Sequence, residues 1–350
     1  MKSLFAFLAD SQRLPVVGAS IIFAAQAGLQ YAQAAPSPPP VASIAGDPIL
    51  PAAPMPAWVK AENDRFAGAR ANATSGSAVA TRADLATMAA PVVSDDALAV
   101  SELASSSDED EGEGRRGRGK FAAPQGVAVD LQGDVYVTDT ARQKVFKLTR
   151  DGKRVTVGSG FMVPQDVAVD AADNVYVADS QAGVIYKITP SGAQRTVGSG
   201  FYMPMSVAVD AAGNVYAADP WNNFVAKITP EGTQTSLGGG FGSPVGVAVD
   251  AAGNVFVADT YNTAVYMITP KGTQTTLVSN LVAPMYLAVD SIGQLFVTDA
   301  GANSLIAIDL SGVTTTVEKR LDVPMGVAAD PVGGLYVVDS FDRKVVRVDP

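Results

Sequence analysis

The feature that most restricts the fold is a repeat of 40 residues, which runs from Phe121 to the end of the chain without an insertion. Each copy carries proline at its fourth position, followed by a short apolar run such as GVAVD. The six copies begin at Phe121, Phe161, Phe201, Phe241, Leu281 and Leu321. Repeats of this length are supersecondary units that bury their apolar faces only against neighbouring copies.

Each copy contains several short runs rich in valine, isoleucine and aromatic residues. In the first copy these runs are GVAVD, VYVTD, VFKLT and RVTVG. Alternating β-branched and aromatic residues are typical of strands. The breaks between the runs, such as DAAGN and TPSG, are tight-turn sequences. Each copy is therefore predicted to be a four-stranded antiparallel meander.

Side-chain size changes along each copy in a way that predicts a ring. Strands near a central axis crowd one another and admit only small side chains, whereas blades splay apart farther out. The first run has alanine at one fixed position, at Ala128, Ala168, Ala208, Ala248, Ala288 and Ala328. The second run has an aromatic residue, at Tyr136, Tyr176, Tyr216, Phe256, Phe296 and Tyr336. We therefore predict an all-β fold, a six-bladed β-propeller.

The repeated motif P-x-G-V-A-V-D-x-x-G-N-V-Y-V-A-D-(T/S) resembles that of NHL-repeat propellers. The resemblance runs from Phe121 to Pro350, and the texture of the repeats is most similar to the sensor propellers of some bacterial receptor kinases. Streptogramin-lyase-like and sugar-lactonase-like propellers have similar repeats. The resemblance implies the fold, and it leaves both binding and catalytic functions open.

The sixth copy ends after its third predicted strand, KVVRVD. An unpaired strand at a sheet edge invites pairing with another segment. Repeat spacing places one candidate for the missing strand at Glu113–Lys120, and the earlier run APVVSDDALAV, residues 90–100, is a second candidate. In a third alternative the edge stays open for a partner.

The residues before the repeats predict an exported protein with a linker. Residues 1–34 have the basic start, the uncharged run and the small-x-small AQA sequence of a signal peptide, and they could instead form a membrane anchor. Residues 35–114 are rich in proline, alanine and serine and include an acidic run, so we expect a disordered linker before a propeller at 115–350. The expected location is periplasmic or extracellular.

Composition argues against several functions. The chain has a net charge of −10 and contains neither cysteine nor histidine. The residues from 121 onward include 15 Lys and Arg against 22 Asp and Glu, a difference of −7, which disfavours binding to nucleic acid. Without histidine, the histidine-dependent lyase mechanism of the streptogramin-type relatives cannot operate. We expect no catalytic residue, no metal and no cofactor.

Two aspartates recur in each copy, at the ends of the first and second predicted strands. A ring of carboxylates for a metal is one interpretation. Because every turn needs an acceptor for its backbone N–H groups, we instead expect a structural role in which each aspartate caps the turn that follows it. The two sets run from Asp130 to Asp330 and from Asp139 to Asp339 in steps of 40 residues.

Residues that differ between copies are the candidates for function. Two regions should share one end of the propeller, namely the link into the first strand and the loop between the second and third strands. Their departures from the common pattern form a predicted contact surface for a protein, peptide or glycan. The predicted binding residues are Trp221, Tyr261, Phe341, Arg142, Arg343, Asp166, Tyr286, Asn222 and Asn262.

The alternative function is an enzyme of the lactonase or lyase type with a divalent cation at the mouth of the axis. Such a site needs several convergent carboxylates and amides. Asp166 is the only carboxylate at its position in the six copies, with Gln125 and Gln165 beside it. This donor set is small, so we favour a non-catalytic binding module.

Overall fold

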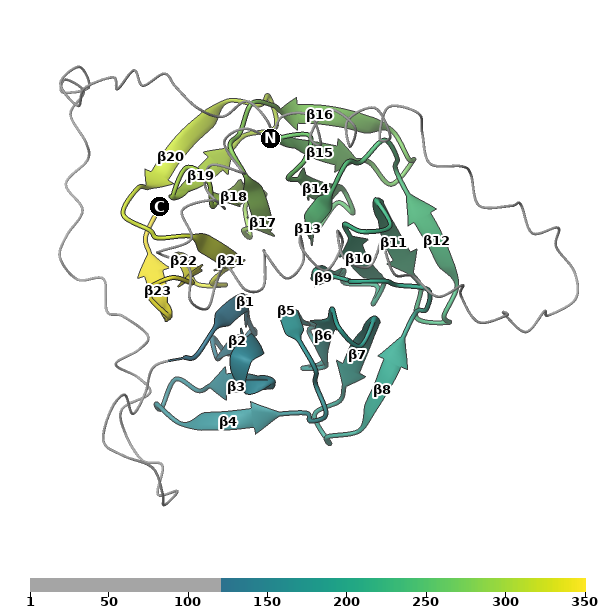
Figure 1. Ribbon diagram of the computed structural model, residues 1–350, viewed down its shortest axis with the longest axis vertical. Coiled ribbons are helices and arrows are strands. Elements are labelled where there is room, and N and C mark those ends of the chain that lie inside the picture. The colour runs from purple at the N-terminus through teal and green to yellow at the C-terminus, as the bar shows by residue number, and fades with distance from the viewer. Residues whose placement is uncertain (1–120) are drawn as a thin grey trace, which may run out of the picture. The chain divides into compact units, whose positions relative to one another are not determined.

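The computed structural model describes residues 121–350, which form a six-bladed β-propeller (Figure 1). Five blades are four-stranded antiparallel sheets, and the sixth blade has three strands from the described residues. The predicted fold class is thereby confirmed. Within the described residues, no helix is long and apolar enough to cross a membrane. The predicted signal peptide or anchor and the predicted linker lie outside these residues.

The strands follow the repeat in order. Blade 1 contains β1 (Pro124–Val129), β2 (Val135–Asp139), the 3₁₀ helix η2 (Thr140–Arg142), β3 (Lys144–Leu148) and β4 (Arg154–Val157). Blade 2 contains β5 (Pro164–Val169), β6 (Val175–Asp179), β7 (Val184–Ile188) and β8 (Gln194–Val197). Blade 3 contains β9 (Ser206–Val209), β10 (Val215–Asp219), β11 (Phe224–Ile228) and β12 (Gln234–Leu237).

The second half of the ring continues this pattern. Blade 4 contains β13 (Pro244–Val249), β14 (Val255–Asp259), β15 (Ala264–Ile268) and β16 (Gln274–Val278). Blade 5 contains β17 (Pro284–Val289), β18 (Leu295–Asp299), β19 (Ser304–Ile308) and β20 (Thr314–Glu318). Blade 6 contains β21 (Pro324–Ala329), β22 (Leu335–Asp339) and β23 (Lys344–Val348).

The first strand of every blade lies nearest the axis, and successive strands lie farther out (Figure 1). In blade 1 the register places Ala128 of β1 opposite Tyr136 of β2, so a small side chain on the inner strand adjoins a large one on the next strand. Tyr136 is buried between blades together with Val167 and Val175 of blade 2. The predicted gradient of side-chain size is confirmed.

The ring closes at its inner strands through described residues. The Ser340 hydroxyl of blade 6 donates to the carbonyl oxygen of Pro124 at 2.9 Å, and the Gln125 amide donates to the Ser340 oxygen at 3.2 Å. The outer edge of blade 6 is β23. Both candidate closing segments, Glu113–Lys120 and residues 90–100, lie outside the described residues, so the source of a fourth strand stays a prediction.

The aspartates that end the first strands accept hydrogen bonds from the following turn, as expected. Asp130 Oδ1 accepts from the backbone N–H groups of Gln132 at 3.0 Å and Asp134 at 2.8 Å. Its other oxygen accepts from the Tyr136 hydroxyl at 3.1 Å. These aspartates therefore join a tight turn to the aromatic wedge of the same blade.

The aspartates that end the second strands have donors that the sequence did not indicate. Asp179 accepts from the N–H groups of Met162 at 2.7 Å and Val163 at 2.8 Å, which precede β5, as well as from Ala182 in the following turn at 3.2 Å. The expectation of a structural role was right, but the main donors lie 16 and 17 residues upstream. Each of these aspartates joins two surface segments of one blade.

Gly246 shows how closely the inner strands approach one another. A Cβ atom at this position would lie 2.2 Å from the carbonyl oxygen of Met285 in β17. Because that neighbour is backbone, we expect Gly246→Ala to lower the free energy of unfolding by about 1–3 kcal/mol, measured by urea denaturation. Gly239→Ala is the control, since nothing lies within 4 Å of its Cβ position. Equal midpoints for the two variants would contradict this close packing.

Candidate functional site on one end of the propeller

The two regions chosen from the sequence do share one end of the propeller. Pro124 at the start of β1 pairs with Asp139 at the end of β2, so the link before β1 and the loop after β2 lie together. The N–H of Thr140 donates to the carbonyl oxygen of Ala123 at 3.0 Å and fastens the two segments. The corresponding loops of the other blades adopt the same arrangement. We call this end the loop face; it consists of the links before the first strands and the loops between the second and third strands.

Seven of the predicted residues lie in these loops. Tyr261 is 42% exposed, and its ring lies over Gly242, where a Cβ atom would be 2.5 Å from Tyr261 Cδ1. Trp221 is half-buried. Phe341 is also half-buried and packs against the core. The other four are Arg142, Asn222 and Arg343, which are exposed, and Asn262, which is half-buried.

The buried aspartates hold this surface in place. Asp219 accepts from the N–H of Tyr202 at 2.6 Å and from the side-chain amide of Asn222 at 2.9 Å. In blade 4, Asp259 accepts from the side-chain amide of Asn262 at 2.8 Å. Both asparagine amides also donate to a glycine carbonyl of the link. A rigid scaffold thus presents the aromatic and amide groups.

Asp166 and Tyr286, the remaining two predicted residues, are buried at the axis and are not part of the exposed surface. Tyr286 of blade 5 donates its hydroxyl hydrogen bond to the carbonyl oxygen of Met205 in blade 3 at 3.2 Å. Asp166 Oδ2 accepts from the Ser206 hydroxyl at 2.8 Å and the Val207 N–H at 3.0 Å. They therefore join blades across the axis, because the first strands converge where these residues lie.

Burial dominates the protonation of both groups. It raises the pKa of the Asp166 carboxyl from 3.8 to about 7, although hydrogen bonds from Val207, Ser206 and Val167 act in the opposite direction. Burial, together with the nearby Asp166 charge, raises the pKa of Tyr286 well above its ordinary value. Tyr286 is therefore a neutral hydrogen-bond donor at all working pH values.

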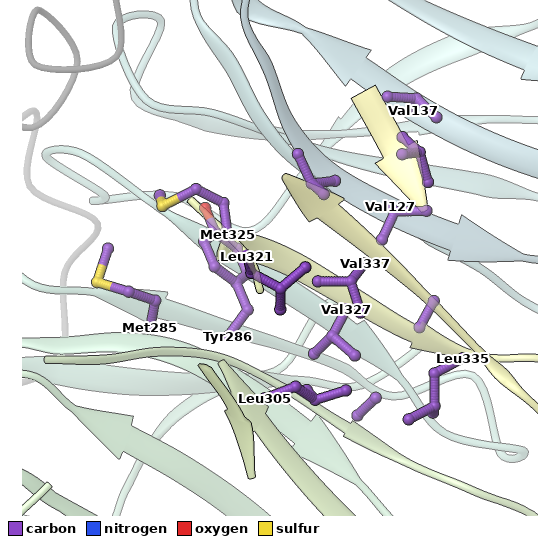
Figure 2. Close-up of a cluster of buried hydrophobic side chains, with 14 of the residues drawn as sticks. Val127, Val137, Met285, Tyr286, Leu305, Leu321, Met325, Val327, Leu335 and Val337 are labelled. Carbon is purple, nitrogen blue, oxygen red and sulfur yellow. The ribbon is translucent and has the colours of Figure 1, made fainter. Parts of the chain in front are cut away.

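The residues that follow the repeated proline fill the axis at this end. In blades 3 to 6 they are apolar and belong to the same buried cluster as Tyr286; Figure 2 shows Met285, Met325 and Tyr286 among its members. In blades 1 and 2 they are Gln125 and Gln165, which are 0% and 2% exposed. The expectation of a soft rim around an open mouth was wrong, because these side chains pack inward.

The donor set for a metal is small at the axis and elsewhere in the described part of the chain. Residues 121–350 contain no cluster of three or more His, Cys, Asp or Glu that could hold a metal ion. Both oxygens of Asp166 already accept hydrogen bonds from the protein. Gln125 Oε1 and Gln165 Oε1 are buried without a partner among the described residues.

The sequence comparison overlooked two exposed residues of the loop face. Met162 is 43% exposed and Tyr202 is 42% exposed. Both occupy the second position of their repeat, directly after the phenylalanine. The other copies have Ala122, Gly242, Val282 and Asp322 there. The same comparison between copies, applied at this position, would have found them.

The opposite end of the propeller also exposes apolar side chains. They lie in the turns between first and second strands and between third and fourth strands of blades 5, 6 and 1. Their exposed fractions are 66% for Leu131, 88% for Ile292, 61% for Leu310, 61% for Val313 and 73% for Val332. This end provides control positions for tests of the loop face.

These features define a six-bladed β-propeller whose differences between blades collect in surface loops. The chain is built from NHL repeats, and the NHL repeat model matches residues 121–148 and 241–265. The family resemblance seen in the sequence is thereby confirmed. No curated protein matches the chain.

Several solved structures share the fold. Virginiamycin B lyase from Staphylococcus aureus is 15% identical, with 64% of this chain and 79% of that chain covered and a TM-score of 0.53. A gluconolactonase from Xanthomonas campestris is 14% identical, with 66% and 87% covered and a TM-score of 0.58. A chain of a nidogen–laminin complex is 24% identical, with 55% and 79% covered and a TM-score of 0.52. At these identities the likeness concerns the fold alone.

Proposed function

We propose that the protein is a non-catalytic recognition module that binds its partner on the loop face. The observation that carries this proposal is the group of exposed aromatic side chains on loops of adjacent blades, Tyr202 and Tyr261, with the half-buried Trp221 between them in sequence. Aromatic residues dominate binding energy at interfaces because they bury a large area and keep a polar group. The buried aspartates supply the rigidity that such a surface needs.

Export is part of this proposal and comes from the sequence alone. The uncharged run from Leu14 to Ala35 and the AQA sequence support a signal peptide or anchor, and residues 35–114 would then act as a spacer. An exported propeller on a spacer would present the loop face outside the cytoplasm. Catalysis by a cation at the axis is less well supported, since Asp166 is buried and its oxygens are engaged.

Replacing Trp221 and Tyr261 with alanine should weaken partner capture at least tenfold, because aromatic anchors contribute about 2 kcal/mol or more each. The measurement is recovery of a partner from an extract by the full chain, compared with the double variant. Ile292→Ala on the opposite end is the matched control, and its capture should equal that of the unmodified protein. Undiminished capture by the double variant, with melting temperatures unchanged, would show that this face is not the binding surface.

A further inference from the structure

Charge is distributed unevenly around the loop face. The loops and links of blades 2 to 5 contain no aspartate, glutamate, lysine or arginine. We call this region the uncharged arc. It consists of the links 158–163, 198–203, 238–243 and 278–283 and the loops 180–184, 220–224, 260–264 and 300–304.

Charged residues of the loop face are confined to blades 6 and 1. The link before β21 carries Glu318, Lys319, Arg320 and Asp322, and the loop after β22 carries Asp342, Arg343 and Lys344. The loop after β2 carries Arg142 and Lys144. The acidic propeller therefore keeps charge away from four consecutive blades at this end, although charged residues are ordinarily about a quarter of a domain.

The uncharged arc presents flat apolar rings among neutral polar groups. Tyr202, Trp221 and Tyr261 follow one another from blade 3 to blade 4, and Met162 adjoins them on blade 2. The nitrogens of the Asn222 and Asn262 side chains are held by the scaffold. Their amide groups, with the serine, threonine and glutamine side chains of the arc, can donate and accept hydrogen bonds without bearing a charge.

We infer that the uncharged arc binds a neutral polysaccharide, an inference that rests on the proposed recognition function of the loop face. A sugar ring has an apolar C–H face that packs on an aromatic ring and hydroxyls that pair with amides. A neutral ligand offers no counter-charge, so any charged side chain beneath it would be desolvated without a partner at a cost of several kcal/mol. The absence of charge across four blades meets that requirement.

The same distribution argues against the competing partners. An acidic polysaccharide or a phosphate-bearing chain would need lysine or arginine in the arc. Protein partners usually bring complementary charges, which raise association rates and select the correct partner. The arc offers nothing for such charges to pair with, whereas blades 6 and 1 do.

Affinity gel electrophoresis of the full chain tests the inference. Amylose, hydroxyethyl cellulose and galactomannan serve as neutral probes, and alginate and polygalacturonate as acidic probes. We expect at least one neutral probe to retard the protein and neither acidic probe to do so. Because no charge pairing is involved, retardation should be the same in about 0.1 M and about 1 M NaCl.

Variants localise the effect. Tyr202→Ala and Trp221→Ala should each weaken retardation at least tenfold, while Ile292→Ala on the opposite end should leave it unchanged. Retardation by the acidic probes alone would overturn the inference. It would also be overturned if no neutral probe acted while Trp221→Ala still abolished capture of a protein partner; the proposed recognition function would then stand. If neither capture nor retardation depended on Trp221 and Tyr261, both proposals would fail together.

Discussion

The Asp166→Asn protein should be more stable than the unmodified protein at about pH 8 by about 3 kcal/mol, and no more stable than it at about pH 4. Asp166 is buried at the axis, and burial raises the pKa of its carboxyl from 3.8 to about 7. A rise of about 3 pKa units corresponds to about 4 kcal/mol for the ionised form. Asparagine removes that charge and loses an acceptor, which costs about 1 kcal/mol.

The sign follows from proton binding. Because the folded-state pKa lies above the unfolded-state value, the folded protein binds more protons than the unfolded chain between about pH 4 and about pH 7. The contribution of Asp166 to stability is therefore fully present below about pH 4 and is lost as the pH rises through about 7. Urea denaturation at several pH values measures the slope, which Asp166→Asn should abolish.

Asp170 in the same blade is a matched control with the opposite sign. Burial raises the pKa of its carboxyl, but hydrogen bonds from Asn174 and Tyr176 outweigh burial and lower the pKa below its ordinary value. Its contribution to stability is present at neutral pH and lost as the pH falls through the lowered pKa. Asp170→Asn should therefore destabilise the protein at neutral pH. Asp166→Asn and Asp170→Asn curves that shift in the same direction would contradict the assignment.

Deleting residues 108–120 should destabilise the propeller by about 4 kcal/mol if Glu113–Lys120 supplies the fourth strand of blade 6. Adding one strand to the edge of β23 forms about four backbone hydrogen bonds, and each contributes about 1 kcal/mol. The deletion should also promote self-association, since β23 would become an unpaired edge. Thermal unfolding and analytical ultracentrifugation measure these two effects.

A second deletion separates the alternatives for closure. Removal of residues 90–100 should leave stability unchanged if the later segment closes the ring. Loss of stability from this deletion alone would assign closure to the earlier run. If both deletions left the unfolding curve unchanged, neither segment would pair with β23, and its edge would be open to a partner.

The ring could be predicted from the sequence because its determinants are local and periodic. Alternation of side chains along each run identifies strands, and the turn sequences limit each blade to four of them. The alanine at Ala128 and the aromatic residue at Tyr136 indicate the distance of each strand from the axis, because packing space grows with radius. The pairing of Pro124 with Asp139 follows from the meander and places the candidate loops at one end.

Only the tertiary structure decided which departures from the repeat are exposed. Asp166 and Tyr286 are as unusual in the sequence as Trp221, but they occupy the first strands, where six blades converge and side chains fill the axis. Tyr202 is exposed because its backbone is fastened to Asp219, which lies 17 residues farther along the chain. A repeating sequence specifies the position of a residue within its blade. Its exposure depends on the neighbouring blades, whose distance from it is set by assembly of the whole ring.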